Sequence, residues 1–221
     1  MRITNRVCQA AGSDLTAPED GAVYVVDGGD AFALIDTGAG NTVEKILGYL
    51  RESGLLAKRA AYIVATHAHI DHIGGLAALR EFLGCQVVAH AADKPAIESG
   101  DPRRTGANLY RMSCTPCPVD LTMDQDVLVL PVGTATLHLI HTPGHTPGSI
   151  CAWVKDGEET VLFAQDLHGP FHADWGSDRD LWRKSLQQLL RLDADILCEG
   201  HFGVYSGKAS VRSYIQSYLY R

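Results

Sequence analysis

The chain has 221 residues, 46% of them hydrophobic, and a formal net charge of −7. This length allows one sizeable core, so we expect a single domain over residues 1–221. The basic residues are scattered, with Arg103 and Arg104 as the only adjacent arginines, which predicts no nucleic-acid partner. Residues 1–8 lack the apolar core of a signal peptide, and no apolar run is long enough to cross a membrane. We therefore predict a cytoplasmic protein without a membrane partner.

The first part of the chain alternates between expected strands and a helix. Residues 2–8 and 22–27 are predicted as strands, and a Gly-Gly turn at 27–30 leads into a further strand at 31–35. Helical spacing of apolar residues follows at 42–53, and Gly54 ends that helix.

The next stretch, residues 66–72, reads Thr-His-Ala-His-Ile-Asp-His and places four potential metal ligands within a short loop. It follows a predicted buried strand at 60–65 and precedes a predicted helix at 73–83, a position where α/β sheets place their sites. Side chains two residues apart leave the same face of an extended backbone, whereas those at the turn into a helix can point elsewhere. One loop could therefore serve two neighbouring ions, with zinc, iron or manganese suited to imidazole and carboxylate ligands.

A strand at 85–89 and a short helix at 90–97 are expected before the chain changes character. Residues 99–120 lose apolar periodicity and are rich in Gly, Pro and polar residues, which predicts a long lid or specificity loop with a helical turn near 108–112. In this loop Cys114 and Cys117 are either a redox or metal-binding pair or two ordinary loop thiols.

The second half of the chain is predicted to contain further strands and two long helices. The expected strands are 127–130, 135–140, 149–154, 160–164 and 194–198, and the expected helices are 178–192 and 207–220. Asp178 is the expected N-cap of the first of these helices. Tyr110, Phe171 and Trp175 could line a pocket or belong to the core.

Five motifs in order along the chain resemble the pattern of the metallo-β-lactamase superfamily. They are Asp36-Thr37-Gly38, His67-x-His69-x-Asp71-His72, Thr142-Pro143-Gly144-His145, Asp166 after a strand, and Glu199-Gly200-His201. The resemblance implies that family's α/β fold, a four-layer αβ/βα sandwich of two mixed β-sheets flanked by helices. One departure is Gln165, which stands where the family pattern has glycine before the aspartate.

The resemblance also implies a ligand set for two divalent metal ions. Carried over by position, the first ion would be held by His67, His69 and His145. The second would be held by Asp71, His72 and His201, and Asp166 would bridge the two ions. Zinc is the expected metal, with iron or manganese as alternatives.

Three further residues are candidates for supporting roles. By resemblance, Asp36 would lie beneath the metal loop and hold it by hydrogen bonds, although an aspartate at a strand end also suits an ordinary turn. His168 and His172 follow the Asp166 strand. Each could bind substrate or assist proton transfer, or serve only in surface packing.

The family pattern predicts a dinuclear metal-dependent hydrolase. A metal-bridging hydroxide would attack a small ester, thioester, lactone or phosphoester, with Asp71 as the catalytic residue that orients the nucleophile or relays its proton. One alternative is a mononuclear iron persulfide dioxygenase, an oxidoreductase, using His67, His145 and Asp166. Another is a non-catalytic metal-binding protein. In the enzyme hypotheses the partner is a small-molecule substrate.

Overall fold

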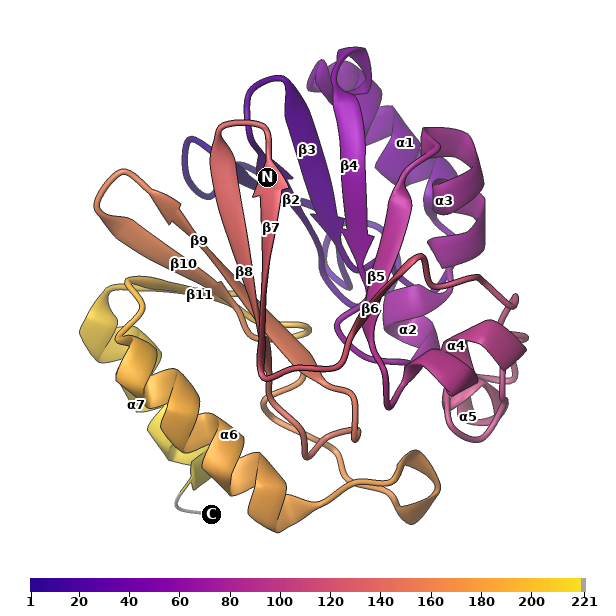
Figure 1. Ribbon diagram of the computed structural model, residues 1–221, viewed down its shortest axis with the longest axis vertical. Helices are drawn as coiled ribbons and strands as arrows, with labels where there is room; N and C mark the ends of the chain where they lie inside the picture. Colours follow the sequence, from indigo (N-terminus) through magenta and orange to yellow (C-terminus); the bar gives the residue numbers. More distant parts are fainter. Residues whose placement is uncertain (220–221) are drawn as a thin grey trace.

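The computed structural model describes residues 1–219 and contains two six-stranded sheets that face each other, with helices on the outer side of each (Figure 1). In spatial order the first sheet contains β1 Val7–Ala11, β2 Val23–Asp27, β3 Ala31–Ile35, β4 Arg59–Val64, β5 Gln86–His90 and β6 Leu121–Met123. The second contains β12 Val204–Ser206, β11 Ile196–Cys198, β10 Glu159–Phe163, β9 Ile150–Asp156, β8 Ala135–His141 and β7 Val127–Val132. Both sheets mix parallel and antiparallel pairs, because β3 to β6 are parallel in the first sheet and β10 and β11 in the second. The predicted four-layer sandwich is confirmed.

Alternating side chains on the strands explain the layers. On β2, Val23 and Val25 point into a core beneath the helices, whereas Tyr24 and Val26 point into the core between the two sheets. On β10, Leu162 likewise joins the core under the outer helices. Because both faces of the central strands are covered, these strands are nearly continuous runs of buried residues, as expected for sheets packed on both sides.

Outer helices cover each sheet. On the first sheet they are α1 Val43–Glu52, η1 Leu55–Ala57, α2 Ile70–Ile73, α3 Leu76–Leu83, α4 Lys94–Ser99 and α5 Ala107–Tyr110. The second half adds η2 Ala173–Trp175, α6 Arg179–Leu192 and α7 Lys208–Leu219. Asp178 caps α6 as predicted, since its carboxylate accepts the backbone N–H groups of Asp180 and Leu181. None of the helices within residues 1–219 is long and apolar enough to span a membrane.

The start of the chain was predicted incorrectly. The expected strand at 2–8 is a tight turn, in which the N–H groups of Ile3 and Thr4 both donate to the carbonyl of Val7, and β1 begins only there. The turn folds Met1 back beside the strand, because the N–H of Gln9 donates to the Met1 carbonyl. Apolar alternation alone cannot distinguish such a reversal from a continuous strand.

Other elements also differ from the sequence prediction. The helix expected at 73–83 begins only at Leu76, as α3, and residues 70–73 form the short helix α2. Gly74 lies between the two helices, where an added Cβ would collide with the carbonyl oxygen of Ala39. The short strands β6 and β12 have too few residues to show periodicity and were not predicted. Residue 220 of the last expected helix lies outside the described residues.

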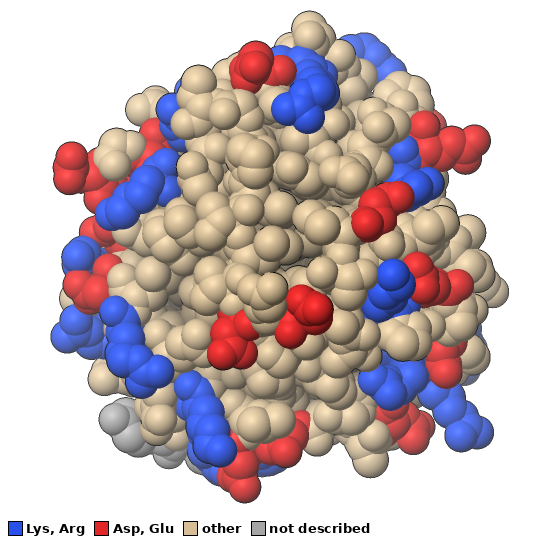
Figure 2. Space-filling view, viewed as in Figure 1, with Lys and Arg blue, Asp and Glu red and all other residues tan. Residues whose placement is uncertain are grey.

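Charged side chains are mixed on the surface. On the face drawn in Figure 2, basic and acidic groups lie near one another, and no large area carries a single sign. Oppositely charged side chains on the surface also form ion pairs, as Arg80 does with Asp120 at 2.7 Å. This face offers no broad basic surface of the kind that binds a phosphate backbone.

Candidate metal centre

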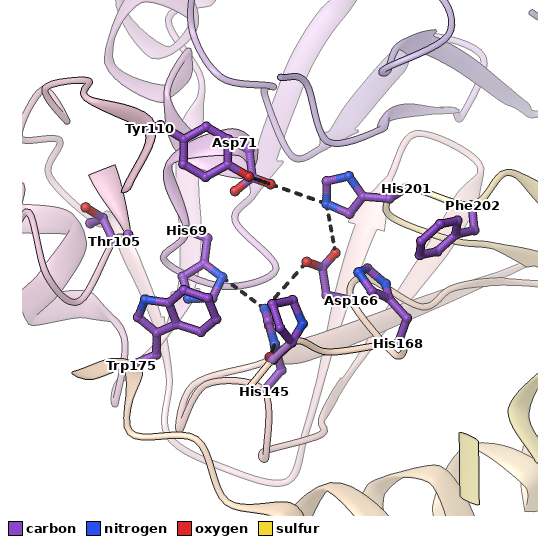
Figure 3. Close-up of a pocket in the computed structure, with 12 residues that line it drawn as sticks. His69, Asp71, Thr105, Tyr110, His145, Asp166, His168, Trp175, His201 and Phe202 are labelled. Carbon is purple, nitrogen blue, oxygen red and sulfur yellow. Dashed lines mark hydrogen bonds and ion pairs between the residues drawn. The ribbon is translucent and has the colours of Figure 1, made fainter. Parts of the chain in front are cut away.

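Seven polar side chains converge at the edge where strands of both sheets end. Figure 3 labels those that also line a cavity, namely His69, Asp71, His145, Asp166 and His201. The loop after β4 and the short helix α2 contribute four of them. The loops after β8, β10 and β11 contribute one each. The residues are His67, His69, Asp71, His72, His145, Asp166 and His201. All but His201 are buried. Because the seven side chains converge, the structure brings together every ligand position that the sequence resemblance implied.

Three imidazoles and a carboxylate form the first group. The Nδ1 of His69 lies 3.1 Å from Nε2 of His67 and 2.9 Å from Nε2 of His145. The Oδ2 atom of Asp166 lies 3.5 Å from Nε2 of His145. These four atoms face a common centre.

The second group shares the same aspartate. Its other oxygen, Oδ1 of Asp166, lies 3.2 Å from Nε2 of His72 and 3.4 Å from Nε2 of His201. The Oδ2 atom of Asp71 lies 3.3 Å from Nε2 of His201. Asp166 therefore presents one oxygen to each group.

The donor atoms fit divalent cations. Tetrahedral ligands with bonds of 2.0–2.1 Å to zinc stand roughly 3.3 Å apart, close to the separations of the nitrogen and oxygen atoms here. The Oδ1 of Asp166 is buried without a well-directed hydrogen bond, although two imidazole nitrogens lie beside it. The Nδ1 of His145 lies 2.8 Å from the Pro170 carbonyl, to which it can donate, leaving its Nε2 lone pair to face the centre.

The electrostatics of the two groups differ. Burial lowers the pKa values of His67, His69 and His145, which favours the neutral imidazole that binds metals. For His72, burial acts in the same direction, but the carboxylates of Asp166, Asp71 and Asp36 raise its pKa well above the ordinary value. The second group therefore has more carboxylate charge around its imidazole. A cation bound there would displace the proton that His72 otherwise holds.

Asp36 lies beneath the metal loop. One of its carboxylate oxygens accepts the backbone N–H of Thr66 at 2.8 Å. The other accepts the Thr66 hydroxyl at 2.7 Å and lies 2.8 Å from Nδ1 of His72. It therefore fixes both the loop and the orientation of one candidate ligand.

A second buried aspartate, Asp93, was not singled out from the sequence. Its carboxylate accepts the N–H of Ala68 at 2.9 Å, the hydroxyl of Thr146 at 2.7 Å and the N–H of Gly148 at 2.9 Å. It thereby ties the loop of His67 and His69 to the loop of His145. Its partners are distant in sequence, so no local pattern reveals this role.

Glu199 belongs to the fifth motif, although the motif alone indicates no role for it. It is fully buried, and its carboxylate accepts the N–H groups of His201 and Phe202 at 2.6 and 2.9 Å, while its other oxygen lies 2.8 Å from Nδ1 of His168. A carboxylate two residues before a candidate ligand was the local signal that could have indicated it.

A cavity of about 280 Å³ opens over the two groups, and a segment of the predicted specificity loop borders it. Thr105, Gly106 and Tyr110 line one side, with Trp175 nearby, while His168 and Phe202 line the other side. His172 is not among the lining residues. It is more than half exposed and caps η2 through the N–H of Asp174.

The second half of the predicted loop does not border the cavity. Cys114, Cys117 and Val119 are buried in the core beneath the first sheet's helices. Both cysteines are free thiols, and burial raises the pKa of each to about 11. Thiols that stay protonated are poor nucleophiles, which favours the interpretation as ordinary buried thiols.

Sequence comparison identifies the family. The family model described as the metallo-beta-lactamase superfamily matches residues 16–201. The chain belongs to the metallo-β-lactamase superfamily. As a member of this superfamily it is a metallo-hydrolase, which confirms the family and the enzyme class expected from the five motifs.

Relatives within the metallo-β-lactamase superfamily include enzymes that act on different substrates. The acyl-coenzyme A thioesterase MBLAC2 of Gallus gallus is 31% identical over 219 residues, which cover 86% of this chain and 75% of the relative. The hydroxyacylglutathione hydrolase of Methylococcus capsulatus is 28% identical and matches 80% of this chain. The chain spans 57% of the length of the Homo sapiens MBLAC2 that it matches, and 60% of the Methylococcus enzyme.

Solved structures of metallo-β-lactamases share the fold. The Cronobacter sakazakii metallo-β-lactamase superposes with a TM-score of 0.81 at 23% identity, covering 99% of this chain and 90% of that one. The B3 metallo-β-lactamase BLEG-1 gives a TM-score of 0.76 at 27% identity, covering 94% and 96%. At such identities the likeness to the Cronobacter enzyme concerns the architecture alone.

Proposed function

We propose that the protein is a dinuclear metal-dependent hydrolase of small acyl thioesters or esters, with zinc as the metal. The observation that carries the proposal is the position of Asp166, whose two carboxylate oxygens face two separate, complete groups of ligand atoms. A thioester is favoured among the substrate classes because the Gallus gallus relative is an acyl-coenzyme A thioesterase. We propose that a single domain carries the whole activity.

In this mechanism the ligand groups hold two divalent cations. When bound, such a pair supplies a nucleophilic water at neutral pH and polarises the carbonyl that is attacked. The Oδ2 of Asp71 faces His201 and lines the cavity, so this carboxylate can orient the water or accept its proton. Trp175, which packs on His69 with ring centroids 4.3 Å apart, covers the first group and limits access of bulk water.

The alternative mononuclear iron dioxygenase needs only His67, His145 and Asp166. It leaves the second group without a use. That group is complete, with Asp71, His72, Asp166 and His201 presenting ligand atoms within 4.8 Å of one another. The arrangement therefore supports the hydrolase over the dioxygenase.

The decisive measurement is the metal content per chain, by elemental analysis of protein purified without chelator or added metal. We expect two zinc ions per chain, and one in a His201→Ala variant. The matched control is His138→Ala, because His138 stacks on Trp153 in the second sheet and is not a candidate ligand. A single iron per chain, together with oxygen consumption on persulfide, would replace the proposal with the dioxygenase.

Activity is tested separately with a panel of small thioesters, esters, lactones and phosphoesters. The zinc-loaded protein is expected to hydrolyse thioesters or esters, and His67→Ala is expected to abolish this hydrolysis. Two tightly bound metal ions with no hydrolysis of any substrate class would identify a metal-binding protein instead, and hydrolysis that His67→Ala leaves unchanged would also reject the metal-centre mechanism.

A further inference from the structure

A second chamber adjoins the cavity of the metal centre. The cavity and the chamber have similar volumes, about 280 and about 300 Å³, and His201 and Phe202 line both of them. Phe202 is 57% exposed and stands between the two spaces, with its ring 4.7 Å from that of His168 (Figure 3). A molecule bound over the ligand groups can therefore extend past Phe202 into the chamber.

The chamber lies where the two sheets are joined at their edges. Its walls come from β1, the loop after it, and the turn between β11 and β12. The N–H of Ala22 donates to the Gly200 carbonyl at 2.7 Å, and the hydroxyl of Tyr24 donates to the Glu199 carbonyl at 2.6 Å. These bonds between the sheets fix the chamber walls.

The side chain of Gln9 lines this chamber and has one unused hydrogen-bonding atom. Gln9 is 4% exposed and sits beside an irregularity in the pairing of β1 with β2. Its Nε2 donates to the Ala11 carbonyl at 3.2 Å, which fixes the orientation of the amide. Its Oε1 is buried and has no partner among the described residues. A buried carbonyl oxygen is costly to leave unpaired, so Oε1 can accept a hydrogen bond from a donor outside the chain.

The two spaces differ in chemistry. Tyr110, Trp175 and Pro170 give the cavity an apolar, aromatic side. The chamber is lined by Gln9, Ser13 and Asp14, and the last two are exposed at its mouth. The Asp14 carboxylate disfavours an anion there. Gln9 offers an acceptor and Ser13 a hydroxyl donor, which together match the N–H and carbonyl of an amide.

We propose that the chamber binds an amide-bearing arm of the substrate, whose N–H donates to Oε1 of Gln9. The apolar acyl arm of the same substrate lies in the cavity beside Tyr110 and Trp175. The substrate class is thus an acyl thioester or ester in which the other arm carries a secondary amide. This inference rests on the proposed hydrolase function for its substrate, but the chamber can be tested without catalysis.

The binding test compares N-ethylacetamide with methyl propyl ketone, in which a methylene group replaces the N–H. NMR titration follows the Gln9 side-chain amide and the Gly203 N–H in zinc-loaded protein. We expect N-ethylacetamide to bind about tenfold more tightly, a difference set by one hydrogen bond to a buried acceptor. Equal affinity for the two molecules would show that Oε1 of Gln9 accepts a hydrogen bond from an ordered water only, and would overturn the proposal.

Variants assign the preference to Gln9. Gln9→Met keeps the length of the side chain and removes the acceptor, so the tenfold preference is expected to disappear. The matched control is Gln86→Met, at an exposed glutamine on β5, which is expected to keep the preference. If Gln9→Met does not fold, Ser13→Ala at the chamber mouth provides the second variant. It removes the donor to the carbonyl that both molecules keep, so both are expected to bind more weakly by a similar factor, and unchanged affinities for both would count against the proposed amide contact.

Hydrolysis separates this inference from the proposed function. The substrates are S-butyryl-N-acetylcysteamine and the thioester in which a methylene group replaces its N–H. Hydrolysis of both at equal kcat/KM would sustain the hydrolase and overturn the amide arm. A binding preference in the titration with hydrolysis of neither thioester would sustain the chamber and reject the proposed function.

Discussion

The phenolic oxygen of Tyr110 lies 3.1 Å from Oδ2 of Asp71 and donates a hydrogen bond to it. This contact connects α5, in the predicted specificity loop, to a candidate ligand in α2 (Figure 3). The backbone reinforces the connection, because the N–H of Ile70 donates to the Thr105 carbonyl at 2.8 Å. Burial and the nearby Asp71 carboxylate raise the pKa of Tyr110, so its hydroxyl keeps the proton that it donates.

Removal of this hydroxyl in Tyr110→Phe is expected to lower kcat about tenfold, equivalent to about 1.4 kcal/mol, because a hydrogen bond to the Asp71 carboxylate is lost. KM should change less, since the ring remains in the cavity wall. Steady-state kinetics on the best substrate of the thioester panel gives both constants. Tyr62→Phe, on strand β4, is the control, and an equal loss in both variants would argue against a specific role for Tyr110.

Asp36→Asn is expected to weaken metal binding at the second group by about 10- to 100-fold, since the variant loses the charge that orients His72. Asparagine tolerates the left-handed backbone that Asp36 adopts, with φ of 63°, so the chain should still fold. Stepwise zinc titration of metal-stripped protein measures the two affinities. Asp20→Asn is the control, because buried Asp20 also holds a loop through the N–H of Ala39 and the hydroxyl of Thr42. Equal zinc affinities in Asp36→Asn and Asp20→Asn would contradict the prediction.

Asp93→Asn is expected to weaken zinc binding at the first group instead of the second. It loosens the connection between the loops that carry His69 and His145, so zinc affinity at the first group should fall while the second group changes little. The same zinc titration checks this. Weakening of both groups to the same extent in Asp36→Asn and Asp93→Asn would show that each aspartate supports the fold as a whole instead of one group.

His90 predicts a pH dependence of stability outside the metal centre. Burial and electrostatic repulsion by the neighbouring His141 lower the pKa of His90 to about 4. The two rings stack with their centroids 3.7 Å apart. An unfolded histidine has a pKa of about 6.5. Since the unfolded chain binds this proton more readily than the folded one, the stability is complete above about pH 6.5 and is lost as the pH falls toward about 4.

His90→Asn is therefore expected to lose less unfolding free energy than the parent between about pH 7 and about pH 5, by under about 1.4 kcal/mol per pH unit. The asparagine carbonyl can still accept the Ala92 N–H that His90 accepts at 3.2 Å. Urea unfolding of both metal-stripped proteins at the two pH values measures the difference. Histidines of the metal centre titrate in both proteins and cancel, so parallel losses would contradict the lowered pKa of His90.

Much of the fold could be predicted from the sequence because it is encoded locally. The central strands are short runs of apolar residues, the long helices repeat their apolar residues with helical spacing, and Asp178 lies one residue before the helix that it caps. The exceptions are short or irregular. Strands β6 and β12 have three residues each, too few to display a period, and the turn before Val7 resembles a strand in its composition.

The sequence by itself determined the types of the candidate ligands and their order, because His67, His69, Asp71 and His72 lie within six residues of one another shortly after a strand. Only the tertiary structure decided that Asp166 presents one oxygen to each group, and that Asp93 ties two loops together. The same applies to the phenol of Tyr110 on Asp71 and to the unpaired Oε1 of Gln9. Each of these depends on atoms brought together from distant segments at the edge of two packed sheets. Contacts between such distant segments produce no periodic pattern in the sequence.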